Sequence, residues 1–279
     1  LQTSISSGTV IGPFIGGFVA DLTSYRTVFF VTSGLCFFSG LLVLLIVKEP
    51  ERTASKKIYS VFENYKYVFK SSYLIVAMLS ITLIQVSVTI AQPVFALFVE
   101  SITKGTEYIS TLTGAIFGTL GIFSIISSPW WGRRNDTKSF KKNLIIAITG
   151  AGVAYCLHTF IKNPYLLFPV RAFLGLCVGG MIPILYAYIN KNITDDRKGG
   201  VMGIASSFNL LGNLIGPLLC TVLLFELPMK YIFLVAGIML FMNAILIFYN
   251  VKENKKAANP EGEVIVKDSV IIDVKEVKT

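Results

Sequence analysis

Near its start the chain reads Gly8-Thr-Val-Ile-Gly12-Pro13-Phe-Ile-Gly16-Gly17, and the core of this stretch returns as Gly212-Asn-Leu-Ile-Gly216-Pro217. Glycines four residues apart lie on one face of a helix, where they let a second backbone approach closely. A proline directly after the second glycine kinks such a helix. A kinked, closely packed apolar helix that occurs twice predicts a duplicated, all-α membrane protein rather than a soluble domain.

The composition agrees with a membrane-embedded chain. Hydrophobic residues make up 53% of the sequence, charged residues make up 15%, and the mean hydropathy is +0.68. A helix that crosses a bilayer needs about 20 apolar residues. We expect eight such spans, at 1–20, 27–47, 72–99, 108–129, 143–161, 164–190, 201–225 and 231–250.

The net charge of +9 is unevenly distributed over the loops. If the segment after the second span is cytoplasmic and the sides alternate, 20 of the 25 lysines and arginines lie on the cytoplasmic side and four on the other. The positive-inside rule therefore predicts a multi-pass cell-membrane protein with a cytoplasmic C-terminus. The basic excess reflects this topology and predicts no nucleic-acid partner.

The repeat sets the expected domain organisation. Residues 1–49 align without gaps on 205–253, and four predicted spans lie between the two helix pairs. In a plan of two six-helix halves, the copies are helices 5 and 6 and helices 11 and 12. The chain begins at Leu1, inside a helix, so we expect it to be the C-terminal portion of a longer protein. We divide it into the end of the first half (1–47), a central cytoplasmic loop (48–71), the second half (72–250) and a tail (251–279). We expect the tail to be disordered, with a short strand as the alternative.

These features resemble the major facilitator superfamily, and within it the drug:proton antiporters. The run from Gly8 to Gly17 is similar to the antiporter signature of helix 5. The segment 131–142 resembles the basic loop between helices 8 and 9: Gly132, Asp136 and Lys141 match, whereas Thr137 and Ser139 replace an arginine and a glycine. Arg171-Ala-Phe-Leu-Gly175 is similar to an element of helix 4 but stands in helix 10, and 196–203 resembles the basic, glycine-rich start of helix 11.

The resemblance implies a major facilitator-type helix bundle in which the first glycine-rich helix packs on the opposite half near the extracellular side. Glycine faces at Gly8, Gly12 and Gly16 would let the halves close there; ordinary small-residue packing is the alternative. Asp136, in a short cytoplasmic loop, either meets a basic neighbour or a helix N-terminus, or is a solvated turn residue.

Polar side chains form two stripes on otherwise apolar helices. Thr82, Gln85, Thr89 and Gln92 share one face of the helix at 72–99, and Ser206, Asn209 and Asn213 share one face of the helix at 201–225. Polar groups within a span face protein or water, so the stripes either line a cavity or bond the helices together. Arg171 either bonds carbonyls, extends to the outer interface or contacts substrate, and His158 is expected to be packed rather than to relay protons.

The candidate site residues fall into four groups. They are the gating motif (Gly8, Gly12, Pro13, Gly16, Gly17), the cytoplasmic motif (Gly132, Asp136, Lys141), the second glycine-proline helix (Gly212, Gly216, Pro217) and the cavity residues (Gln85, Thr89, Gln92, Arg171, Asn209, Asn213).

The predicted function is secondary active transport, with proton-coupled efflux of drugs or amphiphilic molecules as the first hypothesis. Transport of a metabolite or sugar is the alternative, and a membrane enzyme or scaffold a third. All 16 acidic residues lie in loops, at span ends or in the tail, so we expect the proton-carrying carboxylate in the missing first four helices. The expected partners are a small-molecule substrate, the lipid bilayer and protons; we expect a monomer without catalytic activity, cofactor or metal.

Overall fold

The computed structural model describes residues 12, 15–46, 59–103 and 108–251, and these form helices and short connections without any strand. After a helical segment at 15–22, the elements are α2 (Tyr25–Ile46), α3 (Val61–Lys70), α4 (Ser72–Thr89), α5 (Gln92–Ile102), α6 (Ile109–Thr137), α7 (Phe140–His158), the short η1 (Pro164–Leu166), α8 (Leu167–Lys191), α9 (Lys198–Leu223) and α10 (Met229–Asn250).

Seven helical stretches in the described residues are long and apolar enough to cross a membrane. They correspond to seven of the eight predicted spans, and the predicted all-α, membrane-spanning fold is confirmed. The remaining predicted span, at 1–20, lies mostly outside the described residues, as do Gly8, Pro13 and the tail 252–279.

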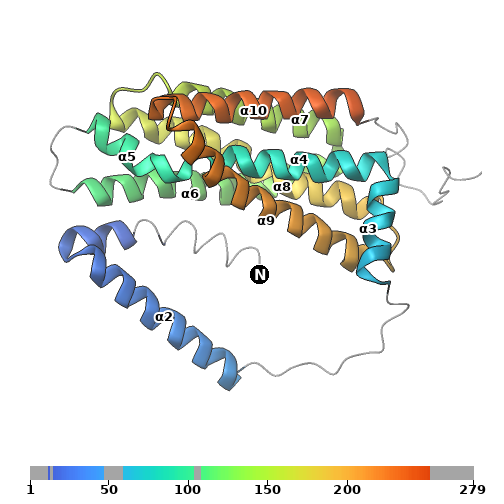
Figure 1. The fold of residues 1–279 in the computed structure, drawn as a ribbon, viewed down its shortest axis with the longest axis horizontal. Helices are drawn as coiled ribbons and strands as arrows, with labels where there is room; N and C mark the ends of the chain where they lie inside the picture. The colour runs from blue at the N-terminus through green and yellow to red at the C-terminus, as the bar shows by residue number, and fades with distance from the viewer. Residues whose placement is uncertain (1–11, 13–14, 47–58, 104–107, 252–279) are drawn as a thin grey trace, which may run out of the picture.

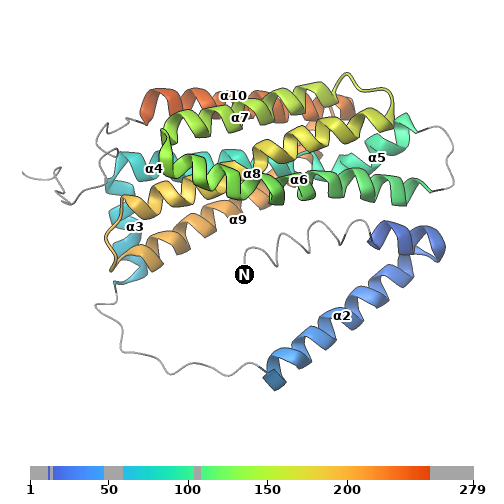
Figure 2. The same cartoon turned by 180° about the vertical axis from the view of Figure 1, so that it is seen from behind.

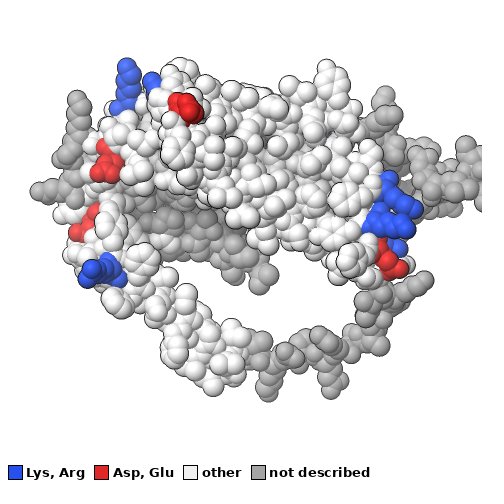
Figure 3. All heavy atoms as spheres, viewed as in Figure 1, with Lys and Arg blue, Asp and Glu red and all other residues white. Residues whose placement is uncertain are grey.

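Helices α4 to α10 form one bundle, whereas α2 stands apart from it in both views (Figures 1 and 2). Helix α8 packs closely on α6 because two of its glycines have no side chain. A Cβ at Gly175 would overlap the carbonyl oxygen of Leu120, and one at Gly179 would overlap the hydroxyl of Ser127. No residue of α2 is buried. On the face shown in Figure 3, the charged side chains gather toward the two ends of the bundle and the length between them is uncharged, as a membrane span requires.

The stretch predicted as one helix at 72–99 is broken in the structure. Helix α4 ends at Thr89 and α5 begins at Gln92. Pro93 is the cause, because its ring has no N–H and would collide with the carbonyl of the residue four positions earlier, Thr89, in a continuous helix.

The predicted cytoplasmic loop around Asp136 is also different. Helix α6 continues to Thr137, so Gly132 and Asp136 are helical, and only Lys138 and Ser139 separate it from α7. Ser139 caps α7 by accepting a hydrogen bond from the Lys142 N–H at 3.2 Å. The residues match the resembled loop motif, but here they lie in the last turn of one helix and the first turn of the next.

The central segment 48–71 was predicted as a loop, and the structure places α3 in its second part. This helix runs across the end of the bundle rather than along the spanning helices (Figures 1 and 2).

Candidate functional site

The helical segment 15–22 contacts the start of α6, at the end of the bundle opposite α3 (Figure 1). A Cβ at Gly17 would overlap the carbonyl oxygen of Ser110 and would lie 2.9 Å from its carbonyl carbon. The hydroxyls of Tyr25 and Ser110 are hydrogen-bonded at 3.0 Å. Close backbone approach at this glycine therefore brings together segments about 90 residues apart.

Asp21 strengthens the same contact. Its Oδ2 accepts hydrogen bonds from the Thr111 backbone N–H at 2.6 Å and from the Thr111 hydroxyl at 2.5 Å. Thr111 is in the first turn of α6, where backbone N–H groups lack helical partners and a negative charge is favoured. Burial opposes ionisation of Asp21, but the hydrogen bonds from Thr111 and Ser110 outweigh it and lower the pKa of this carboxyl.

The predicted glycine face is partly corrected by this geometry. A Cβ at Gly12 would meet nothing within 4 Å, and one at Gly16 would be in ordinary contact with Val28 at 3.8 Å. The close approach is at Gly17 because the face that carries Gly17 and Asp21, four residues apart, is the one turned toward α6. Asp21 was missed in the sequence, although an acidic residue one turn after the glycine pair was the available signal.

The two predicted polar stripes meet each other. Gln85 Nε2 donates to Asn213 Oδ1 at 2.7 Å, Asn213 Nδ2 donates to Asn209 Oδ1 at 3.4 Å, and Asn209 Nδ2 donates to Gln85 Oε1 at 3.4 Å. We call these three half-buried side chains the amide ring. Each amide donates one bond and accepts one, so each retains a second N–H for another acceptor.

The glycines of the second repeat make the amide ring possible. A Cβ at Gly212 would lie 2.6 Å from Gln85 Cβ, and one at Gly216 would overlap the Thr89 hydroxyl. That hydroxyl also bonds the carbonyl oxygen of Gly212 at 3.3 Å. Interhelical bonding, one of the two interpretations of the stripes, is therefore present for Gln85, Thr89, Asn209 and Asn213. Gln92 is exposed and lies on α5, beyond the break.

Arg171 is held by aromatic rings inside the bundle. It is 4% exposed, and its guanidinium carbon lies 3.6 Å from the ring centre of Phe95 and 5.3 Å from that of Phe117. Within the described residues its Nε has no hydrogen-bond partner. Extension to the interface, one of the three predicted roles, does not fit this burial. A cation–π clamp was not predicted.

His158 is packed, as predicted. It is fully buried, its Nδ1 bonds the Ala154 carbonyl oxygen at 2.7 Å, and its ring stacks on Phe233 with a centroid separation of 5.3 Å. These contacts explain its position by packing alone.

The cytoplasmic motif residues have separate partners. Asp136 is paired with Lys191 at the end of α8 at 3.8 Å, and both side chains are exposed. Lys141 Nζ donates to the Phe248 carbonyl oxygen at 2.6 Å, in the last turn of α10. A Cβ at Gly132 would meet nothing within 4 Å. The exposed ion pair is weak, on the order of 0 to 1 kcal/mol, which suits a contact that forms and breaks.

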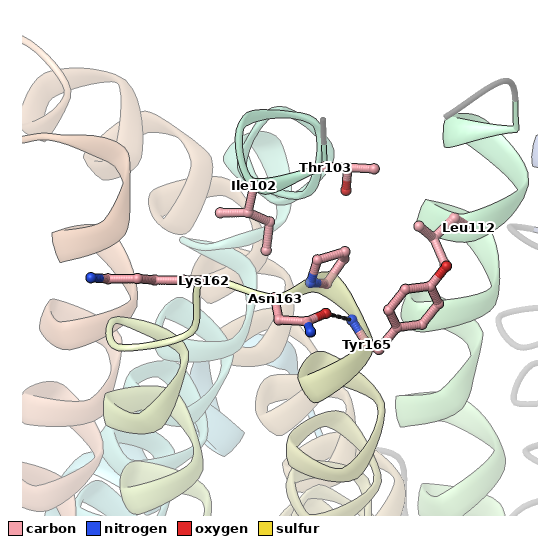
Figure 4. Close-up of a pocket in the computed structure, with 7 residues that line it drawn as sticks. Ile102, Thr103, Leu112, Lys162, Asn163 and Tyr165 are labelled. Carbon is pink, nitrogen blue, oxygen red and sulfur yellow. Dashed lines mark hydrogen bonds between the residues drawn. The ribbon is translucent and has the colours of Figure 1, made fainter. Parts of the chain in front are cut away.

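An open pocket of about 380 Å³ lies at the end of the bundle near the start of α6 (Figure 4). It is lined by Ile102, Thr103, Leu112, Lys162, Asn163, Pro164 and Tyr165. Asn163 Oδ1 accepts from the Tyr165 N–H at 3.0 Å, which shapes the turn before α8. No predicted site residue lines this pocket, and among the described residues no group of His, Cys, Asp and Glu is arranged to hold a metal ion.

Comparison with known proteins agrees with the helix arrangement. A sequence model described as Major Facilitator Superfamily matches residues 1–134 and 83–278. The chain is 31% identical over 258 residues to the uncharacterized MFS-type transporter YuxJ of Bacillus subtilis, which covers 91% of this chain and 66% of that protein. It is 28% identical over 273 residues to the multidrug resistance protein MdtG of Enterobacter lignolyticus, covering 98% of this chain and 65% of the relative. MdtG of Klebsiella pneumoniae is 30% identical over 253 residues, covering 88% and 60%.

A solved structure shares the fold. The human organic anion transporter MFSD10 matches with a TM-score of 0.52 at 17% identity, over 63% of this chain and 46% of that one. The chain thus spans 60% to 66% of the length of the three curated relatives. Their names describe transport or drug resistance, in agreement with the prediction of a transporter rather than an enzyme.

Proposed function

The chain belongs to the major facilitator superfamily, and we propose that the full-length protein is a secondary active transporter that exports drugs or other amphiphilic molecules by alternating access. In this proposal residues 1–47 end the first six-helix half and 72–250 form the second, which is the parallel-repeat plan of such transporters. The C-terminus is cytoplasmic, because the basic residues are concentrated on that side.

The observation that carries the proposal is the contact of Gly17 and Asp21 with the start of α6. It joins the proposed first half to the second at the end of the bundle opposite the basic loops. Such a contact closes the extracellular side, and it has to open when the halves rock. Three hydrogen bonds and the close approach at Gly17 all reach Ser110 and Thr111 in the first turn of α6, and we call this set of contacts the latch. It is specific but small enough to break.

The amide ring is the proposed polar part of the substrate site. Its side chains are half-buried, and each amide keeps one N–H that is not used within the ring. Amide groups bind neutral polar parts of a substrate without selecting for charge. This agrees with the drug-resistance names of two relatives and does not favour a dedicated phosphate or sugar-acid site, where clustered cations are expected. Gln92 and Arg171 remain proposed cavity residues, whereas the Thr89 hydroxyl bonds a backbone carbonyl.

Proton coupling is part of the proposal. Every described carboxylate lies at or beyond the end of a helical segment, so a titrating carboxylate in mid-membrane has to come from outside the described residues. The proposed carrier lies in the four helices that precede this chain in the two-half plan.

The test is export of fluorescent cationic dyes from cells that express the full-length protein. We expect dye loss that stops when a protonophore collapses the proton gradient, and that is reduced by Gln85→Leu at equal expression. Thr119→Val is the matched control, since the Thr119 hydroxyl bonds only its own helix at Ala115. Failure to export any of several dyes, or export that persists without the gradient, contradicts the proposal.

A further inference from the structure

Helix α3 is the one described helix that crosses the end of the bundle instead of following the spans (Figures 1 and 2). It therefore lies roughly parallel to the membrane surface. At about 100° per residue, its ten residues divide into three faces, one packed on the protein, one aromatic and one charged.

The packed face fixes α3 to the start of α9. Asn64 and Val68 are buried, and a Cβ at Gly200 would overlap the Asn64 side chain. The Arg197 guanidinium lies 3.7 Å from the ring centre of Tyr59, just before the helix. The N-terminus is closed by a capping box in which the Ser60 N–H donates to Glu63 at 3.0 Å.

Polar contacts around Tyr59 also hold α3 against the α8–α9 connection. Hydrogen bonds from Thr194 and then from Tyr59 hold the pKa of the Asp196 carboxyl below its usual value. The helix is thus positioned by polar contacts at the α8–α9 connection, and its orientation relative to the bundle is set by the protein rather than by the solvent.

None of the residues that the structure describes covers the aromatic face of α3. Phe62 is 85% exposed and Phe69 is 58% exposed, and Phe69 stacks on Tyr65 with a centroid separation of 6.3 Å. Large rings on the rim of a membrane protein are stabilised at the level of the lipid headgroups, where one side is apolar and the other is wet.

The charged face adjoins the aromatic one. Lys66 and Lys70 are exposed and lie about 40° to 100° around the helix from the two phenylalanines. The segment 48–71 carries six lysines and arginines against three carboxylates. Basic residues beside an in-plane apolar face are the arrangement by which helices bind anionic lipid surfaces.

We propose that α3 is an in-plane membrane anchor that binds anionic phospholipid headgroups, with Phe62 and Phe69 inserted at the headgroup level and Lys66 and Lys70 on the phosphates. This function is separate from transport and adds a lipid contact to the start of α9, the helix that carries two members of the amide ring.

The depth of α3 is measured with spin labels on the full-length protein in vesicles that contain phosphatidylglycerol. Cys36→Ser removes the exposed cysteine, and labels are placed at Phe62→Cys or at its neighbour Glu63→Cys. We expect the label at position 62 to collide mainly with membrane-dissolved oxygen and the label at 63 mainly with a water-soluble nickel chelate. Equal or reversed accessibilities overturn the proposal.

Lipid selectivity is measured by energy transfer from a fluorophore at Phe62→Cys to phosphatidylglycerol or phosphatidylcholine labelled on the acyl chain, each in phosphatidylcholine vesicles. We expect a preference for phosphatidylglycerol that falls roughly threefold or more in Lys66→Gln/Lys70→Gln. The control Lys138→Gln/Lys142→Gln removes the same charge from the α6–α7 connection and the first turn of α7, and it keeps the preference. An unchanged preference in the first pair, or an equal loss in both pairs, overturns the proposal whether or not the protein exports dyes.

Discussion

Replacing Gly17 with alanine adds one methyl group to the contact that we propose closes the extracellular side. The new Cβ would overlap the Ser110 carbonyl oxygen, and ordinary contact requires a retreat of about 1 Å. Overpacking of this kind costs about 1 to 3 kcal/mol. The higher helix preference of alanine over glycine stabilises the segment equally with the contact closed or open, so it does not offset this cost. The closed state therefore loses about 1 to 3 kcal/mol relative to the open one, or a factor of roughly 5 to 150 in its population.

The assay is labelling of Ser110→Cys by a membrane-impermeant maleimide in a Cys36→Ser background of the full-length protein. We expect Gly17→Ala to raise the labelling rate by roughly 5 to 150 times. Gly12→Ala is the matched control, because a Cβ there would meet nothing within 4 Å, and its labelling rate stays at the parental value. Equal rates in the two variants would refute the reasoning that Gly17 is the point of closure.

Three further predictions concern separate contacts. Asp21→Asn removes the charge that accepts hydrogen bonds from the start of α6. Because the pKa of Asp21 is lowered, its contribution is fully present near neutral pH and is lost only as the pH falls through that pKa, so the variant weakens the latch and raises the maleimide labelling rate at pH 7; an unchanged rate contradicts this role. Gly216→Leu separates α4 from α9 and lowers the melting temperature in detergent, whereas Gly203→Leu, at a position with open space, leaves it within a few degrees; equal melting temperatures contradict the packing. Arg171→Met does not lower the melting temperature, because the loss of the cation–π contacts with Phe95 and Phe117 is offset by removal of a buried charge whose Nε has no described acceptor; a clear decrease contradicts this account of the residue.

Local sequence patterns predicted the membrane spans. They failed where tertiary contacts or short helices determine the course of the chain. The apolar runs identified seven membrane helices because a bilayer requires their length and composition. The break at Thr89 followed from Pro93, whose steric effect is local and was available from the sequence. The continuation of α6 through Asp136 was not predicted, because the motif that this segment resembles was interpreted as a loop. The sequence itself has no proline or glycine between Gly132 and Thr137 that would end a helix there.

The functional groups were predicted better than their partners. Helical spacing placed Gln85, Asn209 and Asn213 on polar faces of their helices. The spacing of residues shows which of them share a face but not which helix packs against that face, so the amide ring could be identified only from the structure. Gly17 was predicted within its motif, whereas Asp21 was not. Helix α3 is too short for the span criterion; the Ser60-x-x-Glu63 capping box was the signal that marks its start.

The central claim is that the contact between segment 15–22 and the start of α6 opens and closes during transport. It is tested most directly by the distance between spin labels at Leu22→Cys and Tyr108→Cys, both at exposed side chains, in a Cys36→Ser background of the full-length protein. The account predicts a short distance as the main population, and a longer second population that grows when an exported dye or a pH gradient is applied. A single distance that does not change under either condition would contradict it.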